Sequence, residues 1–341
     1  MPMMSTKPSH TLVQLAVLLA VCVVVLGAFT RLKDAGLGCP DWPGCYGHVL
    51  WPDTSEQIAA AEAAFPDAPF EHEKAWPEVV HRYFAGSLGF LILIIALQAW
   101  RHRHQPAQPF KLPLLLLVLV VAQGLFGMWT VTLKLWPQIV TLHLLGGFST
   151  LSLLWLLKLR LENRQWPTPT ALRPWRELQP LAMLGLVLVL CQITLGGWTS
   201  TNYAALACPD LPTCQAQWWP PMDFRSGFNI TQEIGPNYLG GQMDGEGRIA
   251  IHMTHRFGAI VVALYLGFLI YRLTRRELGP QLRSSGLTLA ALLTLQLTLG
   301  LSNVWWSLPL AVAVAHNAGG ALLLLALITL NYRLHRATKL W

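Results

Sequence analysis

Charged residues are scarce in this chain. Asp, Glu, Lys and Arg make up 12% of its 341 residues, whereas hydrophobic residues make up 53%. A soluble domain carries about twice that charged fraction, so the composition excludes an ordinary soluble protein. The apolar residues instead form runs of about 20, the length that crosses a bilayer as a helix. We therefore predict an all-α integral membrane protein with eight transmembrane helices. The runs lie at about residues 11–30, 79–99, 112–132, 139–157, 181–201, 249–271, 286–304 and 310–332.

Acidic residues are nearly absent from one set of the connecting segments. With the N-terminus inside, most of the 24 Lys and Arg residues fall in cytoplasmic segments, but only Glu162, Glu177 and Glu277 of the 17 acidic residues do. This bias follows the positive-inside rule, so the net charge of +7 sets topology and predicts no nucleic-acid partner. Both termini are then cytoplasmic, and two long loops, about 31–78 and 202–248, lie outside. The first run lacks a cleavage site at its end and is expected to be retained.

The two halves of the chain repeat each other. An offset of 169 residues pairs both cysteines of the first long loop with those of the second, and an offset of 173 pairs later residues such as His143 and His316. Each half has four helices, an even number, so both halves enter the membrane from the same side. We predict two tandem four-helix bundles related by a pseudo-twofold axis along the membrane normal. The predicted segments are an N-terminal bundle (1–157), a cytoplasmic linker (158–180) and a C-terminal bundle (181–341).

Four histidines interrupt the apolar spans, one on each even-numbered helix and each close to its outer end: His81, His143, His255 and His316. At 1.5 Å per residue, the two histidines of one half lie at similar depth. Two imidazoles at matched depth on different helices suit a six-coordinate haem iron, and bundle cores commonly hold such cofactors. The alternative is that these histidines only form interfacial hydrogen bonds. Zinc or copper is disfavoured because no further His, Asp or Cys cluster at that depth completes a small-ion shell.

The two halves differ beside the first histidine. Glu78 precedes His81 by three residues and shares its helix face, whereas the second half has His252 at the corresponding position. A carboxylate near a haem pocket of low dielectric can take or give a proton, or it can pair with Arg82. The asymmetry favours chemistry in the N-terminal half and a supporting role for the C-terminal half.

Two short cysteine loops follow the first helix of each half. They read GLGCPDWPGC (36–45) and ALACPDLPTC (205–214), with five residues between the cysteines. Thiols on the outer side of the membrane are oxidised, and so short a gap containing Pro can bring the sulfurs into bonding range. We predict two disulfides, Cys39–Cys45 and Cys208–Cys214. Each is either a structural clip for a lid over the haem edge or a redox-active bond. The structural role is favoured, and the redox alternative applies more to Cys39–Cys45 than to the second pair.

Several polar residues have two alternative roles each. Arg82 and Arg256 directly follow ligand candidates and could pair with haem propionates or with loop acids. Gln123 and Gln296 recur inside helices, where helix packing is favoured over contact with propionates. Residues 54–65 are expected to form a short capped surface helix.

Two further cysteines, Cys22 and Cys191, lie inside apolar runs. Free cysteine behaves as a small hydrophobe and is among the most buried residue types. We therefore expect both to be buried and to have no chemical role.

Several motifs resemble those of bacterial haem A synthase, and the resemblance covers nearly the whole chain. They are GAFTRLKDAGLGCPDWPGCYG, EVVHRYFAG and HLLGG, with the C-terminal echoes HMTHRFGA and HNAGG. The resemblance implies an oxidoreductase that converts the ring-D methyl of haem O to a formyl through a hydroxymethyl intermediate, for terminal oxidase biogenesis. It implies a substrate haem between His81 and His143, with Glu78 catalytic, and a haem B cofactor between His255 and His316.

The resemblance also implies a location and partners. The location is the cell inner membrane, with the haem sites near the periplasmic side. Haem O synthase would be the haem donor, and terminal oxidase assembly factors would be further partners. Membrane lipid would surround the chain. The resemblance also allows a homo-oligomer. The family has a first-loop cysteine pair that matches Cys39 and Cys45, but many members lack the second pair.

Two other functions compete with the synthase. A di-haem b-type electron-transfer protein, such as a quinol or ferric reductase, would use the four histidines but gives no reason for the difference between Glu78 and His252. A thiol oxidase would use the cysteines but leave the histidines without a role. A transporter is least favoured because no discontinuous helix stands out.

Overall fold

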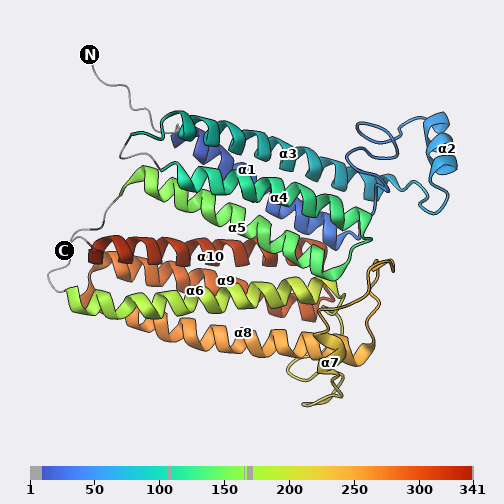
Figure 1. Ribbon diagram of the computed structural model, residues 1–341. Coiled ribbons are helices and arrows are strands. Elements are labelled where there is room, and N and C mark those ends of the chain that lie inside the picture. The colour runs from blue at the N-terminus through green and yellow to red at the C-terminus, as the bar shows by residue number, and fades with distance from the viewer. Residues whose placement is uncertain (1–9, 106–108, 165, 167–171, 340–341) are drawn as a thin grey trace. The chain divides into compact units, whose positions relative to one another are not determined.

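The computed structural model describes residues 10–105, 109–164, 166 and 172–339, and within them the only regular structure is helical (Figure 1). Eight of these helices are long and apolar enough to cross a membrane, which confirms the predicted spans. At most 44% of any span is buried inside the protein, so the remaining apolar surface is available to lipid. The chain is therefore a multi-pass membrane protein. The spanning helices are α1 (His10–Leu32), α3 (His72–Arg101), α4 (Lys111–Thr132), α5 (Pro137–Glu162), α6 (Leu172–Thr201), α8 (Gly245–Leu273), α9 (Pro280–Trp305) and α10 (Leu310–Lys339).

The chain divides into two compact units. Unit 1 consists of residues 1–157, 201–203 and 229–243, and unit 2 of residues 158–200, 204–228 and 244–341. The second long loop is thus shared, because its later part, residues 229–243, packs within unit 1.

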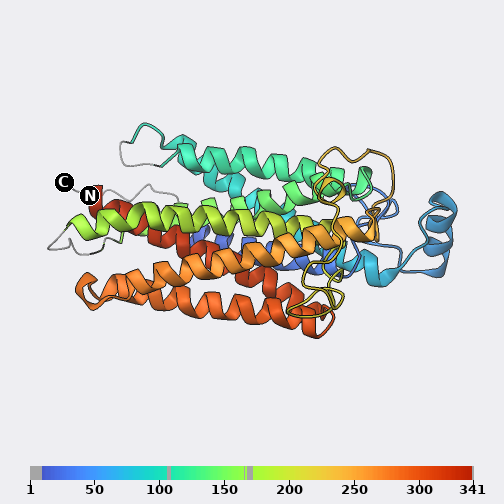
Figure 2. The same ribbon diagram turned by 90° about the horizontal axis from the view of Figure 1, so that it is seen from below.

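Unit 1 contains α1, α3, α4 and α5, which run alongside one another (Figures 1 and 2). Helix α1 packs against α3, and α3 against α4. Small side chains such as Ala16 and Ala20 are buried on α1, which lets neighbouring helices approach closely in a membrane. Cys22, on the same helix, is exposed and free, and so is Cys191 on α6. The expectation that these two cysteines are buried is therefore wrong.

Unit 2 repeats this plan with α6, α8, α9 and α10. Helix α8 packs against α9, and α9 against α10. The segment predicted as a linker, 158–180, is helical at both ends, because α5 continues to Glu162 and α6 begins at Leu172. An ion pair four residues apart supports each extension, Lys158–Glu162 at 2.7 Å and Arg173–Glu177 at 3.1 Å. The short elements of unit 2 are α7 (Phe224–Gly227) and a 3-10 turn, η1 (Arg276–Leu278).

The first long loop folds into a cap with a small core of its own. It contains the expected surface helix, α2 (Ser55–Ala64), whose N-cap Thr54 accepts a hydrogen bond from the amide of Gln57 at 3.2 Å. The hydroxyl of Tyr46 donates to the carbonyls of Ala68 and Pro69 at 3.1 Å each. Burial raises the pKa of Tyr46 to about 12, which keeps this hydroxyl a donor.

Candidate functional site

Two imidazoles face each other inside unit 1. His81 lies on α3 and His143 on α5, and their ring centroids are 6.4 Å apart with the ring planes at 87°. The Nδ1 atom of each ring is buried without a hydrogen-bond partner. Buried polar nitrogens are normally satisfied, so this pair has ligand-binding capacity that the protein itself does not use.

Each of the four histidines packs against a glycine on the preceding spanning helix. An added Cβ would lie 3.0 Å from Cε1 of His81 at Gly27, and 3.5 Å from Cε1 of His143 at Gly127. In unit 2, the corresponding distances are 3.3 Å from His255 at Gly196 and 3.1 Å from His316 at Gly300. The repeat pairs Gly27 with Gly196 and Gly127 with Gly300, so this signal was present in the sequence. That these glycines lie against the imidazole rings is visible only in the structure.

The two histidines of unit 2 have glutamine neighbours. His255 lies on α8 and His316 on α10. The amide nitrogen of Gln192 is 3.1 Å from Nδ1 of His255 and donates to the His255 carbonyl at 2.9 Å. The amide nitrogen of Gln296 is 3.4 Å from Nε2 of His316, and Nδ1 of His316 is buried without a partner. Gln123, the counterpart of Gln296, lies beside Gly146, just as Gln296 lies beside Gly319.

The donor set in each unit suits a haem iron. Within the described residues, no three or more His, Cys, Asp or Glu side chains gather closely enough to hold a bare metal ion. Structural zinc sites use four protein ligands and catalytic ones use three, whereas a haem iron needs only axial ligands such as histidine. Unsatisfied ring nitrogens and glycine seats behind the rings are consistent with this use.

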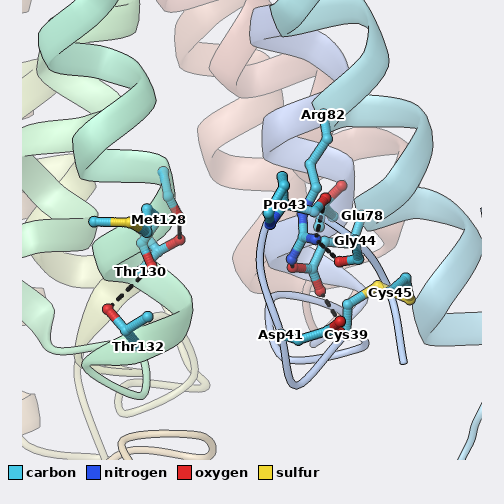
Figure 3. A network of polar contacts seen from close by, with 12 residues as sticks. Cys39, Asp41, Pro43, Gly44, Cys45, Glu78, Arg82, Met128, Thr130 and Thr132 are labelled. Carbon is cyan, nitrogen blue, oxygen red and sulfur yellow. Dashed lines mark hydrogen bonds and ion pairs between the residues drawn. A yellow bond between two sulfur atoms is a disulfide. The ribbon is translucent and has the colours of Figure 1, made fainter. Parts of the chain in front are cut away.

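Glu78 joins the histidine pair of unit 1 to the first cysteine loop. It lies on α3, one turn before His81, and is only 5% exposed. Its carboxylate accepts a hydrogen bond from the amide of Cys39 at 3.0 Å and forms an ion pair with Arg82. The same guanidinium donates to the carbonyls of Pro43, at 3.2 Å, and Gly44 (Figure 3). One carboxylate and one guanidinium thus fasten the loop to α3.

Both predicted disulfides are present, Cys39–Cys45 and Cys208–Cys214. Inside the first loop, Asp41 accepts from the amides of Tyr46 at 2.6 Å and Gly47 at 2.8 Å. The second loop is built in the same way around Asp210. Hydrogen bonds from the Thr213 hydroxyl and from the loop amides lower the pKa of Asp210. Each loop is therefore held by both a covalent bond and an aspartate.

The second loop is fastened to its helix by neutral acceptors. Arg256 donates to the carbonyls of Thr213, Cys208 and Asp210 at 2.8–2.9 Å. Loop carbonyls, rather than loop acids, are thus the main partners of both arginines. His252 donates through Nδ1 to the carbonyl of Ala204 at 2.9 Å and is 5% exposed. Where unit 1 has a buried carboxylate, unit 2 has an imidazole tied to a carbonyl.

A strap from the second long loop, residues 229–243, was not anticipated from the sequence. It lies over the α4–α5 connection in unit 1. Trp136 and Gln138 donate from their side chains to the carbonyls of Gln232 and Ile230, both at 3.0 Å. The amide of Tyr238 donates to the carbonyl of Lys134 at 3.0 Å. The repeat offset widens from 169 at Cys45 and Cys214 to 174 at His81 and His255, which places five extra residues in the second loop. The sequence does not indicate what this part of the loop contacts.

The chain is similar to known proteins over nearly its whole length. Residues 10–328 match the family model described as "Cytochrome oxidase assembly protein". A haem A synthase of Shewanella oneidensis is 47% identical over 330 residues, which are 96% of this chain and 97% of that protein. A haem A synthase of Rhizorhabdus wittichii is 27% identical, with 94% of this chain and 92% of that protein covered. One of Halalkalibacterium halodurans is 24% identical, with 87% of each covered.

Proposed function

The chain belongs to the cytochrome oxidase assembly protein family, and on this basis we propose that it acts as a haem A synthase. The proposed reaction oxidises the ring-D methyl of haem O to a formyl through a hydroxymethyl intermediate. The product, haem A, would serve terminal oxidase biogenesis. One observation carries the proposal within the family: unit 1 combines two facing imidazoles with a buried carboxylate one helical turn from the first.

In this proposal, unit 1 is the substrate site. His81 and His143 would hold the iron of haem O from opposite faces of the macrocycle. Gly27 supports the proposal because it leaves the His81 ring seated against bare backbone on α1. Haem O carries a long apolar tail, so we expect it to reach this site sideways from lipid between the spanning helices.

Glu78 would act as the proton acceptor for ring D. Converting a methyl to a formyl replaces two of its hydrogens with one oxygen atom in two successive two-electron oxidations, so the protons released need an acceptor close to that carbon. Glu78 suits this role because its carboxylate is buried and is held by the Cys39 amide and by Arg82. Held in this way, the carboxylate is oriented before substrate arrives, which is the kind of positioning that speeds a proton transfer.

Unit 2 would hold the cofactor, haem B, between His255 and His316. When bound there, haem B supplies a route for the electrons removed from the substrate. The protein's own contribution in this unit is to orient the two imidazoles, through Gly196 and Gly300 behind the rings and through Gln192 beside His255. His252 ties α8 to the second loop and takes no part in proton transfer in this proposal.

The proposal also covers the membrane location, the orientation and the partners of the chain. The chain would lie in the cell inner membrane with both termini cytoplasmic and the haem sites near the periplasmic side. Haem O synthase would supply the substrate, and terminal oxidase assembly factors would receive the product. The positive-inside distribution of Lys and Arg supports this orientation.

Pigment extraction tests the proposal directly. The chain is expressed in cells that make haem O but lack haem A, and the extracted haems are separated by chromatography. Wild type should yield haem A, and Glu78→Gln should lower the formyl product by at least about 100-fold, the size of a typical general-base contribution. Glu73→Gln is the matched control, because Glu73 lies on the same helix, 75% exposed, in an ion pair with Lys33.

Three outcomes would contradict the proposal in different ways. Two bound haems without any hydroxymethyl or formyl product would favour the di-haem electron-transfer protein. Full product from Glu78→Gln would remove the glutamate from the mechanism. An equal loss in Glu73→Gln would show that the assay reports folding of α3 rather than chemistry.

A further inference from the structure

Each cysteine loop is followed by a pair of exposed apolar side chains. After the first loop these are Val49 and Leu50, and after the second they are Trp218 and Trp219; all four are between 51% and 81% exposed. The repeat offset of 169 pairs the two sets residue by residue. Exposed apolar side chains that gather on a loop mark a surface that binds a partner or a membrane. We call these two pairs the loop tips.

The backbone presents both tips in the same way. Just before the first tip, Cys45 and His48 exchange amide-to-carbonyl hydrogen bonds at 2.9 and 3.0 Å. Cys214 and Gln217 do the same before the second tip, at 2.9 and 3.1 Å. Each of these cysteines is also held in its disulfide. Both pairs therefore follow a closed turn, and their exposure recurs in both halves of the chain.

Contacts with the spanning helices place the tips at the depth of the outer membrane boundary. The Tyr83 hydroxyl, on α3, donates to the Val49 carbonyl at 2.9 Å. The Trp219 ring packs on Phe257 of α8, with 6.1 Å between the ring centroids. Tyr83 lies four residues, or about 6 Å, inside the apolar run that begins near residue 79. Phe257 lies further inside the run that begins near residue 249. Because the tips contact these two residues, they lie beside the bilayer rather than in the water above it.

The helix faces below the tips continue the same apolar surface. On α8, exposed apolar residues recur three, four and seven residues after Phe257. On α3, they recur seven and fourteen residues after Tyr83. Residues at these spacings share one face of a helix, and an exposed apolar face on a spanning helix contacts lipid. Each tip thus lies at the outer end of a lipid-facing stripe.

We propose that the two loop tips insert into the outer leaflet of the membrane, so that each cysteine loop is held from two sides. On one side an arginine fastens the loop to its helix, Arg82 in unit 1 and Arg256 in unit 2. On the other side lipid holds the tip. Lipid is the occupant because it surrounds the spanning helices at this depth and reaches both tips without a partner protein. Tryptophan favours the membrane–water interface, so the second tip is the stronger anchor.

A spin label tests the depth of each tip. Protein in phosphatidylcholine nanodiscs carries a nitroxide on a ketone-bearing amino acid placed at Leu50, Trp219 or Ala63, which leaves every cysteine unmodified. Oxygen collects among acyl chains and a nickel chelate stays in water, so their relative effects on the label report its surroundings. The labels at Leu50 and Trp219 should respond mainly to oxygen. The label at Ala63, exposed on α2, should respond mainly to nickel, because α2 extends beyond the ends of the spanning helices (Figures 1 and 2).

Two results of this measurement would overturn the proposal. A label at either tip that responds mainly to nickel would place that tip in water. A label shielded from both reagents would show that protein, such as a second copy of the chain, covers the tip instead of lipid.

Hydrogen exchange tests the anchoring role. The backbone amides of residues 214–217 are all hydrogen-bonded within the second cysteine loop, so their exchange reports how often that loop opens. Trp218→Ser with Trp219→Ser should speed this exchange in nanodiscs at least about 10-fold, the effect of losing one large buried apolar side chain. Trp305→Ser with Trp306→Ser is the matched control, because these tryptophans lie at the end of α9, outside the cysteine loops, and are 65% and 64% exposed. The control should exchange at the wild-type rate.

The outcome of the exchange experiment is equally sharp. Wild-type exchange in the Trp218 and Trp219 double variant would overturn the proposal. An equal acceleration in the Trp305 and Trp306 control would assign the effect to unit 2 as a whole and overturn the anchoring role. Neither measurement contains turnover or bound haem, so both results are independent of the proposed haem A synthase activity.

Discussion

The glycine seats behind the histidines allow a graded prediction. In Gly27→Ala the new methyl carbon would lie 3.0 Å from Cε1 of His81, and in Gly127→Ala 3.5 Å from Cε1 of His143. Carbon atoms are optimally about 3.5–4.0 Å apart. The first substitution therefore pushes the imidazole by about 0.5 Å or more, and the second leaves it in ordinary contact. Both residues lie inside spanning helices, α1 and α4, so the backbone change is the same in each.

The expected magnitude follows from that displacement. A functional side chain must stay within about 0.5 Å of its productive position, and disturbing the support of a metal ligand typically costs 10–100-fold in affinity. We expect Gly27→Ala to weaken haem binding in unit 1 by at least about 10-fold, and Gly127→Ala by less than about 3-fold. Helix propensity favours Ala over Gly by about 1 kcal/mol, so a loss cannot come from a weakened helix.

Haem content and spectrum are the measurements. Purified variants are titrated with haem, and the low-spin signal of bis-histidine ligation is recorded by absorbance and electron paramagnetic resonance. Gly86→Ala on α3 is the control, because an added Cβ there meets no other group within 4 Å. Wild-type affinity in Gly27→Ala, or a larger loss in Gly127→Ala than in Gly27→Ala, would refute the reasoning.

Three further predictions concern the first cysteine loop. Arg82→Gln removes an ion pair with Glu78 and two hydrogen bonds to the first cysteine loop. It should therefore lower the free energy of unfolding by about 2–3 kcal/mol, measured by thermal unfolding, and greatly reduce product. Unchanged stability and product would show that Arg82 does not hold the loop. Replacing both Cys39 and Cys45 by Ser should cost about 2 kcal/mol but leave measurable product, because Asp41 still holds the loop; complete loss of product in a folded protein would instead indicate a redox-active disulfide. For Tyr46 the folded-state pKa is raised from 10.0 to about 12, so the unfolded chain loses this proton first and stability should fall as pH rises from about 10 to 12. Tyr46→Phe should make that fall shallower in unfolding curves recorded over this pH range. An identical pH dependence in both proteins would contradict the raised pKa of Tyr46.

Composition and periodicity were sufficient for the membrane architecture. Helices in lipid must satisfy their own backbone hydrogen bonds, so a run of about 20 apolar residues has one stable form, and all eight predicted spans are present. The disulfides were predictable for a similar reason, since five intervening residues leave few alternatives to a local pairing. The exposure of Cys22 and Cys191 was not predictable in this way, because an apolar residue on a membrane helix can face lipid as readily as protein.

Only part of the candidate site could be predicted from the sequence. The four histidines stand out because ionisable residues are expensive in a membrane, and the repeat pairs them. Position along a helix does not say which ring meets which, and only packing brings His81 and His143 to 6.4 Å.

The sequence by itself determined which residue types lie at each depth, because helical rise and apolar length depend on local chemistry alone. Tertiary structure decided which of them touch. Glu78 meets a loop amide 39 residues away, Gln192 reaches His255 63 residues away, and a strap from the second loop lies in unit 1. Contacts of this kind depend on how side chains from distant segments share one space, and no local pattern in the sequence carries that information.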